Sequence, residues 1–233
     1  EGVEKSRELA REAVNELRVA SGFGVVRNMT QEYLAENPNA KVRVRCIPTD
    51  DIIDKLINGW ASVGFVMGRP RDSRLDERII MTGRFYIFVN DEHPLAHRDY
   101  IQMADLEGQL VFCSNIAKTH ELASRMMQRA GVTCNLLTLD EKEVLFAAGE
   151  KGLGAVLCMP MMDVHTEHNV EDNHCHFIPI ADAPEVGRVV MLNPKDVYYT
   201  DEQKKYLRYI EQRFARNEQW IENDWKKRDL PEK

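Results

Sequence analysis

The first third of the chain alternates between two patterns of hydrophobic and polar residues. Residues 17–21 and 41–47 switch between polar and apolar positions nearly one by one, which is typical of β-strands. The apolar residues of 26–34 and 52–60 recur every three or four positions, which predicts two amphipathic helices. Residues 62–68 form a nearly continuous apolar run, as in a strand that is covered on both faces. This order of strands and helices predicts a parallel sheet with right-handed crossovers.

The same alternation returns in the rest of the chain. Two strands flank the turn at Gly83–Arg84, strands and helices then alternate again, and a final helix begins near Thr200. We predict strands over 77–82, 85–90, 109–114, 134–139, 154–159 and 187–193, and helices over 118–132 and 140–152. The repeated pattern predicts two similar α/β lobes. The apolar stripe of the last helix continues through Ile221 and Trp225, so we expect its end to pack on the body of the protein or on a partner subunit.

The composition narrows the class of protein. Hydrophobic residues make up 43% and charged residues 30% of the 233 residues, which is ordinary for a globular protein. The net charge of −7 argues against a nucleic-acid-binding surface, which is usually basic. No apolar run reaches the about 18 residues of a transmembrane helix, and the charged first residues do not resemble a signal peptide.

The cysteines point to a reducing compartment. The five cysteines are widely spaced, odd in number and without a Cys-x-x-Cys pair. They are Cys46, Cys113, Cys134, Cys158 and Cys175. This pattern is typical of reduced thiols, so we predict a cytoplasmic protein.

Small and polar residues follow three of the predicted strands, at 21–24, 67–70 and 114–119. In open parallel sheets, ligands bind at the carboxyl ends of the strands, next to helix N-termini that attract small anions. Gly22 and Gly24 would let the backbone approach such a ligand closely. The pattern predicts a cleft for one small molecule, formed by the two lobes. The alternative is that the small residues only let strands and helices pack tightly.

Four segments, in their order and spacing, resemble the effector-binding domain of LysR-type transcriptional regulators. They are residues 17–44, 85–112, 149–160 and 189–214. The segment that begins at Phe85 contains the sequences HPLA and ADL, which are typical of the family, and the segment that begins at Gly149 resembles its spaced glycines before a Leu-Pro. The other two segments resemble the family's first strand–helix–strand unit and its last strand and helix.

The resemblance implies an α/β fold like that of type 2 periplasmic-binding proteins. In this fold two α/β lobes with mainly parallel sheets are joined by a hinge of two crossing strands, here near Val89 and Arg188. Lobe I would comprise 17–89 and 189–233, and lobe II would comprise 90–188.

The resemblance also implies a function. Family members are cytoplasmic repressors or activators, and residues 1–16 resemble the end of the linker helix that follows their winged helix-turn-helix. We expect an effector-sensing domain that is a homodimer or tetramer and that acts on DNA only through that absent domain. We expect no membrane association, no cofactor and no catalytic residue, because no motif of an enzyme is present. The alternatives are a solute-binding protein of a transport system, which shares the fold, and a metal- or redox-responsive regulator domain.

Effector contacts in the family come from the loops after the first and third strands, the turn between the fourth and fifth, and loops of the second lobe. The residues at these places are Ser21, Gly22, Phe23, Met67, Gly68, Arg69, Arg84, Ser114, Asn115, Thr119, Leu139 and Asp140. The hydroxyls of Ser21, Ser114 and Thr119 suit a carboxylate, and Arg69 or Arg84 could pair with it bidentately. The effector that this set predicts is a small carboxylate. The simpler alternatives are that the arginines are solvated surface charges, that Thr119 only caps its helix, and that Phe23 belongs to the core.

The subunit interface that the resemblance implies involves two helices, Val26–Leu34 and Leu122–Ala130. Met126 and Met127 would suit such a surface. The alternative is that both methionines belong to the core.

Histidines concentrate in the sequence HTEHNVEDNHCHF at 165–177. Its candidate metal ligands are His165, His168, His174, Cys175 and His176, a mixture that suits zinc, nickel or copper. Their spacing matches no known finger, and a polar segment that follows Pro160 favours a solvated loop over a metal site. We therefore assign no metal to it and keep the five residues as candidates.

Overall fold

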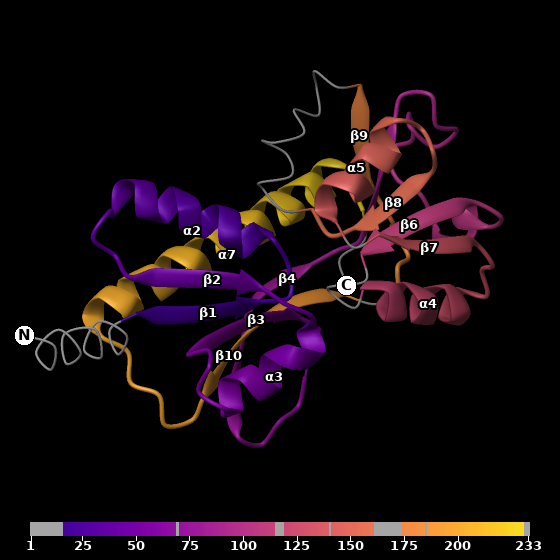
Figure 1. Ribbon diagram of the computed structural model, residues 1–233. Coiled ribbons are helices and arrows are strands. Elements are labelled where there is room, and N and C mark those ends of the chain that lie inside the picture. The colour runs from indigo at the N-terminus through magenta and orange to yellow at the C-terminus, as the bar shows by residue number, and fades with distance from the viewer. Residues whose placement is uncertain are drawn as a thin grey trace, which may run out of the picture. The chain divides into compact units, whose positions relative to one another are not determined.

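Two five-stranded sheets organise the protein, and each belongs to one of two units (Figure 1). The computed structural model describes residues 16–68, 70–114, 119–139, 141–160, 174–184 and 186–230. The first unit is Glu1–Arg78 with Val190–Arg213, and the second is Ile79–Val189 with Phe214–Lys233. The predicted linker helix falls almost entirely on residues outside this description.

The sheet of the first unit is parallel where its first three strands meet. Its order is β2 (Val42–Cys46), β1 (Leu17–Ser21), β3 (Val63–Met67), β10 (Gly187–Pro194) and β4 (Leu75–Gly83). β1 pairs in parallel with both neighbours, so that Ser21 lies opposite Cys46 on one side and Phe65 on the other. The parallel strands predicted from the alternating pattern are therefore confirmed.

Helices α2 (Val25–Glu36) and α3 (Thr49–Ile57) connect these strands. On α3, the buried side chains of Ile52 and Leu56 pack with apolar residues of β1, β3 and β10. The helix ends at Ile57, and Gly59 follows it with a φ of 66°, a backbone conformation that few other residues adopt without strain.

The first half of α7 (Asp201–Lys227) packs against α2 within the same unit. The hydroxyl groups of Thr30 and Tyr206 are 2.7 Å apart in a buried hydrogen bond. The rings of Tyr33 and Tyr206 meet edge to face, with their centroids 5.3 Å apart. These contacts fix the orientation of α2 relative to α7. They therefore also fix the direction in which the N-terminus of α2 points.

The sheet of the second unit is mixed. Its order is β7 (Asn135–Leu139), β6 (Leu110–Ser114), β8 (Ala155–Cys158), β5 (Tyr86–Asn90) and β9 (Cys175–Pro179). β6 is parallel to β7 and β8, whereas β5 is antiparallel to β8 and β9. Two strand–helix repeats followed by an antiparallel pairing give an α/β unit, as the sequence pattern predicts.

Helices α4 (Thr119–Ala130) and α5 (Lys142–Glu150) and the short 3-10 helix η1 (Met103–Leu106) complete the second unit. α4 ends at Ala130 and is followed by Gly131 with a φ of 68°, the glycine that the sequence predicts to close this helix. Met126 is fully buried and Met127 is 5% exposed, and both lie in the core of this unit. The interpretation of these two methionines as interface residues is wrong, because their face of α4 covers the sheet.

β9 is a strand that was not among those predicted from the pattern of hydrophobic and polar residues. The polar sequence at 165–177 favours a solvated loop, yet Phe177 and Ile178 are buried where β9 pairs with β5. The short apolar run of β9 begins only after a histidine-rich stretch, so its periodicity is too brief to stand out.

The division into units differs from the predicted lobes at two places. β5 lies in the second sheet, because its buried residues pair with β8 on one side and β9 on the other. The end of α7 also belongs to the second unit, where Ile221 and Trp225 are each 2% exposed and Tyr86 donates a hydrogen bond of 2.9 Å to Asp224. Of the two alternatives predicted for the tail, packing on the body of the protein is the one that these contacts show.

No helix in the described part of the chain combines the length and the apolar character that crossing a membrane requires.

Candidate functional site

The carboxyl ends of β1, β2 and β3 bring several predicted residues together in the first unit. The backbone N–H of Gly22 donates to the carbonyl oxygen of Phe65 at 2.9 Å, and that of Ile47 donates to the carbonyl oxygen of Ser21 at 3.0 Å. Met67 and Gly68, at the end of β3, lie at the same edge because the three strands are parallel.

Gly22 is the position where this edge leaves least room. A Cβ atom on Gly22 would lie 2.6 Å from Oγ1 of Thr49, the first residue of α3. Thr49 is 8% exposed, so it has little space to move away. A close approach to Gly22 therefore occurs in the structure, and the approaching group is the side chain of Thr49.

Ser21 and the N-terminus of α2 define the polar chemistry of this edge. The fully buried hydroxyl of Ser21 donates to the carbonyl oxygen of Phe23 at 2.7 Å and accepts from its N–H at 3.3 Å. It therefore closes the turn that leads into α2. The helix begins after Gly24 without a side-chain cap or an acidic residue in its first turn, so the positive end of its dipole is not neutralised locally.

The second unit has a comparable edge. Ser114 and Leu139 are direct partners at the carboxyl ends of the parallel strands β6 and β7, and Thr119 begins α4 as a buried residue. Phe23, Ser114 and Leu139 are all half-buried. Three predicted residues, Arg69, Asn115 and Asp140, lie outside the described residues.

Arg84 lies between β4 and β5 against the last turns of α7. Its guanidinium carbon is 4.1 Å from the centroid of the Trp225 ring, which is a cation–π contact. Among the described residues, no carboxylate forms an ion pair with it. The alternative of a plainly solvated charge does not fit, because Arg84 is half-buried on a buried tryptophan.

The end of α7 is held in place by a hydrogen-bonded group around Asp224. Its carboxylate accepts from Tyr86 at 2.9 Å and from Nε of Arg228 at 3.0 Å, and Nη1 of Arg228 donates to the carbonyl oxygen of Asp99 at 2.6 Å. Burial, followed by the neighbouring Asp224 charge, raises the pKa of Tyr86 well above its ordinary value, so the phenol stays a hydrogen-bond donor. This group positions Trp225 and through it Arg84. No signal in the sequence links these distant residues.

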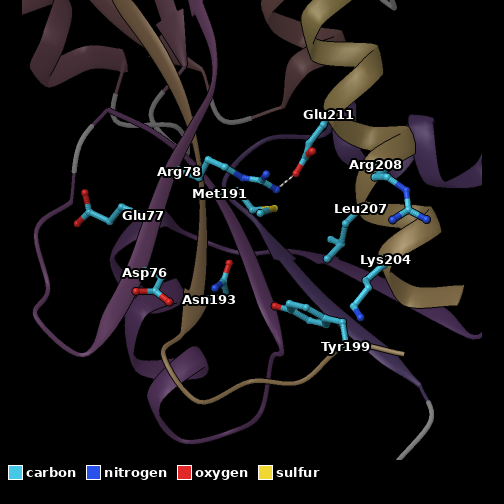
Figure 2. Close-up of a pocket in the computed structure, with 10 residues that line it drawn as sticks. All are labelled: Asp76, Glu77, Arg78, Met191, Asn193, Tyr199, Lys204, Leu207, Arg208 and Glu211. Carbon is cyan, nitrogen blue, oxygen red and sulfur yellow. Dashed lines mark ion pairs between the residues drawn. The ribbon is translucent and has the colours of Figure 1, made fainter. Parts of the chain in front are cut away.

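A separate pocket of about 410 Å³ lies in the first unit beside β4, β10 and the first half of α7 (Figure 2). It is lined by Asp76, Glu77, Arg78, Met191, Asn193, Tyr199, Lys204, Leu207, Arg208 and Glu211. Arg78 and Glu211 form an ion pair within it. The lining has as many acidic as basic side chains, so this pocket does not favour an anion over a cation. None of the predicted effector residues lines it.

The structure separates Cys175 from the two histidines that flank it. Cys175 is 1% exposed, and because successive residues of a strand face opposite sides, its thiol points away from His176. His174 and His176 both contact the carboxylate of Asp91, with Nδ1 of His174 at 2.9 Å. His165 and His168 lie outside the described residues.

Cys113 and Cys175 are buried, Cys134 and Cys158 are half-buried, and Cys46 is exposed. All five cysteines lie in the described part of the chain, and none is in a disulfide. Desolvation raises the pKa of Cys113 to about 12 and that of Cys175 to about 11. A redox-sensing cysteine instead has a lowered pKa, so these thiols do not favour the redox alternative.

Comparison with known proteins bears on the family. The model of the LysR substrate binding domain matches residues 12–215. Three similar solved structures each have a TM-score of 0.67. The effector binding domain of QuiR in complex with shikimate is 12% identical, with 86% of this chain and 97% of that chain covered. The CcmR regulatory domain of Synechocystis PCC6803 in complex with 2-PG is 16% identical, with 87% and 97% covered, and the BenM effector binding domain with its effector benzoate is 14% identical, with 88% and 94% covered. At these identities they show the fold alone. No curated protein matches the sequence.

Proposed function

The chain belongs to the LysR substrate binding domain family, and from this premise we propose that it is the effector-sensing domain of a LysR-type transcriptional regulator. Its fold is the type 2 periplasmic-binding-protein-like fold of that family, with two α/β units. The observation that carries the proposal is that the family match covers nearly the whole chain while the strand ends of each unit present residues suited to a ligand. The protein would sense a metabolite and would not transform it.

The effector that we propose is a small carboxylate. Shikimate and benzoate, in the structures of QuiR and BenM, support this class of ligand. In the first unit, the N-terminus of α2 offers backbone N–H groups and a partial positive charge. In the second unit, Arg84 is held by its face on Trp225, and a guanidinium bound in this way keeps its in-plane N–H groups for a carboxylate.

Regulation would follow from a difference in affinity. A ligand shifts a conformational equilibrium only if it binds one state more tightly than another. We propose that the effector, contacted by loops of both units, biases such an equilibrium and that the change reaches DNA through the DNA-binding domain of the regulator. The effector-sensing domain would work as a cytoplasmic homodimer or tetramer.

The role of Arg84 gives the experiment that tests the carboxylate. In isothermal titration of the 233-residue chain with a panel of small carboxylates, we expect one of them to bind, and we expect Arg84→Gln to weaken its affinity about tenfold or more, since a charge-assisted pair contributes about 1.5–3 kcal/mol. Arg98→Gln is the matched control, because Arg98 is an exposed arginine of the same unit that pairs with Asp105. Binding of only cations or neutral sugars would exclude the proposed effector class.

A further inference from the structure

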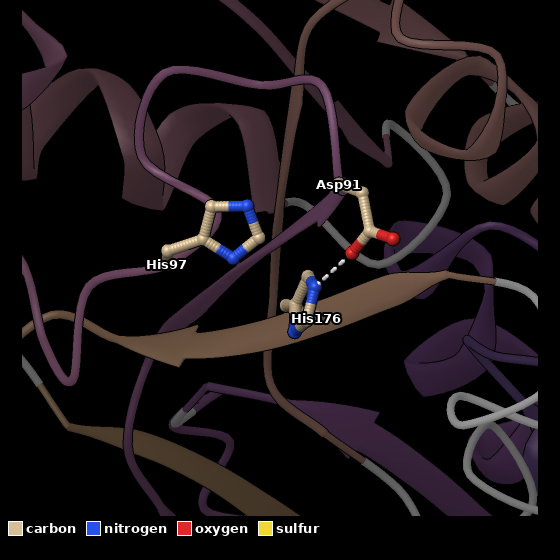
Figure 3. Close-up of side chains that lie close together, drawn as sticks. All are labelled: Asp91, His97 and His176. Atoms are coloured by element: carbon tan, nitrogen blue, oxygen red, sulfur yellow. Dashed lines mark hydrogen bonds and ion pairs between the residues drawn. The ribbon is translucent and has the colours of Figure 1, made fainter.

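Three metal-ligating side chains from separate segments converge at one end of the second sheet (Figure 3). Asp91 directly follows β5, His97 belongs to the connection between β5 and η1, and His176 is on β9. The ligand atoms of all three lie within 4.8 Å of one another. Sequence reasoning considered only the third of them, because neither Asp91 nor His97 lies in the histidine-rich segment.

The pairing of β5 with β9 builds this cluster. The two strands are antiparallel, with Val89 opposite His176 and Asn90 opposite Cys175. The pairing continues beyond the strands, where the N–H of Asp91 donates to the carbonyl oxygen of His174 at 2.8 Å. This backbone geometry holds the Asp91 carboxylate against Nε2 of His176, and the two side chains are in hydrogen-bond contact.

His97 completes the cluster from the opposite side. Its ring is 5.6 Å from that of His176, centroid to centroid, at an angle of 71°. Figure 3 shows the His97 ring turned toward the Asp91–His176 pair. Its side chain is exposed, so a small rotation can bring its ring nitrogen closer without disturbing the core.

Imidazole nitrogens and a carboxylate oxygen are ligands of zinc, and three protein ligands with a water molecule in the fourth position form a common open zinc site. Zinc binds such ligands at about 2.0–2.2 Å, so the three donors must draw together around the ion. The Asp91 and His176 side chains are each 37% exposed, which leaves room for an ion to enter and for a water ligand. Nδ1 of His174 is 2.9 Å from the other Asp91 oxygen, where it orients the carboxylate from outside.

We propose that Asp91, His97 and His176 bind a divalent cation of the zinc class. The ion would take the place of the hydrogen bond between Asp91 and His176 and would tie the β5–η1 connection to β9. The site lies within the second unit and uses none of the residues proposed to contact the effector. It therefore does not depend on the proposed function.

The test is titration of the 233-residue chain with zinc chloride, together with the visible absorption spectrum of bound Co²⁺. We expect binding of zinc at a single site, a rise of Tm on saturation, and a weakening of affinity of about tenfold or more in His97→Asn and in His176→Asn. His120→Asn, which replaces a half-buried histidine on α4, is the matched control and should bind zinc normally. The Tm values of the variants without metal show whether they fold.

A double variant separates this site from the rest of the histidine-rich segment. The double variant His165→Asn and His168→Asn should keep the affinity of the original chain. If this double variant loses zinc, or if His97→Asn folds and binds zinc unchanged, the proposed ligands are wrong. Failure of the original chain to bind zinc would likewise overturn the proposal and would leave Asp91–His176 as an ordinary surface ion pair.

Discussion

Replacing Trp225 with alanine should lower the free energy of unfolding by about 3–5 kcal/mol, the usual cost of truncating a buried tryptophan. The side chain is 2% exposed, lies one residue from the hydrogen-bonded Asp224, and supports the guanidinium of Arg84. Urea denaturation followed by circular dichroism measures the loss. The variant should also bind the effector more weakly, because Arg84 would lose the surface that orients it.

The matched control for this variant is Trp220→Ala, on the same helix. Trp220 is half-buried, and its ring centroid is 6.3 Å from that of Tyr86. Because less apolar area is buried there, the loss of stability should be clearly smaller. Equal losses in the two variants would show that Trp225 has no special place in the packing of α7.

Replacing Gly22 with alanine should destabilise the protein by about 1–3 kcal/mol and abolish effector binding, because inserted atoms strain a filled site. The added Cβ atom would come 2.6 Å from Oγ1 of the buried Thr49, so the turn after β1 or the start of α3 must move. Either movement displaces the N-terminus of α2, which we propose to contact the effector. Denaturation and titration of the same preparation give both quantities.

Gly24→Ala is the control two residues further along the chain. Gly24 has helical dihedral angles, and no atom lies within 4 Å of the position of its missing Cβ. The loss of backbone freedom in the unfolded chain and the poorer cap then nearly cancel, so stability should change by less than about 1 kcal/mol. If Gly22→Ala is as harmless as Gly24→Ala, the first unit has no tight edge at this place.

Local patterns predicted most of the fold. Strict alternation marked β2, a continuous apolar run marked β3, and the glycine after α4 marked its end, because each depends on neighbours in the sequence. β9 was not predicted as a separate strand, because it is stabilised by pairing with β5, which is far away in the chain. Met126 and Met127 show the same limit, since a stripe on a helix does not say whether a sheet or a second subunit covers it.

The candidate sites were predictable only in part, for the same reason. Parallel pairing places Ser21 and Gly22 near the end of β3, and Ser114 beside Leu139, where the order of elements predicts them. The stacking of Arg84 on Trp225 joins residues far apart in sequence, and so does the approach of His97 to His176. Such contacts depend on how β5, β9 and α7 meet in space, which no local pattern encodes.

Hydrogen exchange with and without the bound carboxylate tests the central claim most directly. If the effector is held by the strand-end loops, amide exchange should slow at residues 21–24 and around Gly68 in the first unit, and around Ser114, Thr119 and Leu139 in the second. Protection confined to one unit, or centred on the pocket beside β4 and α7, would contradict the account.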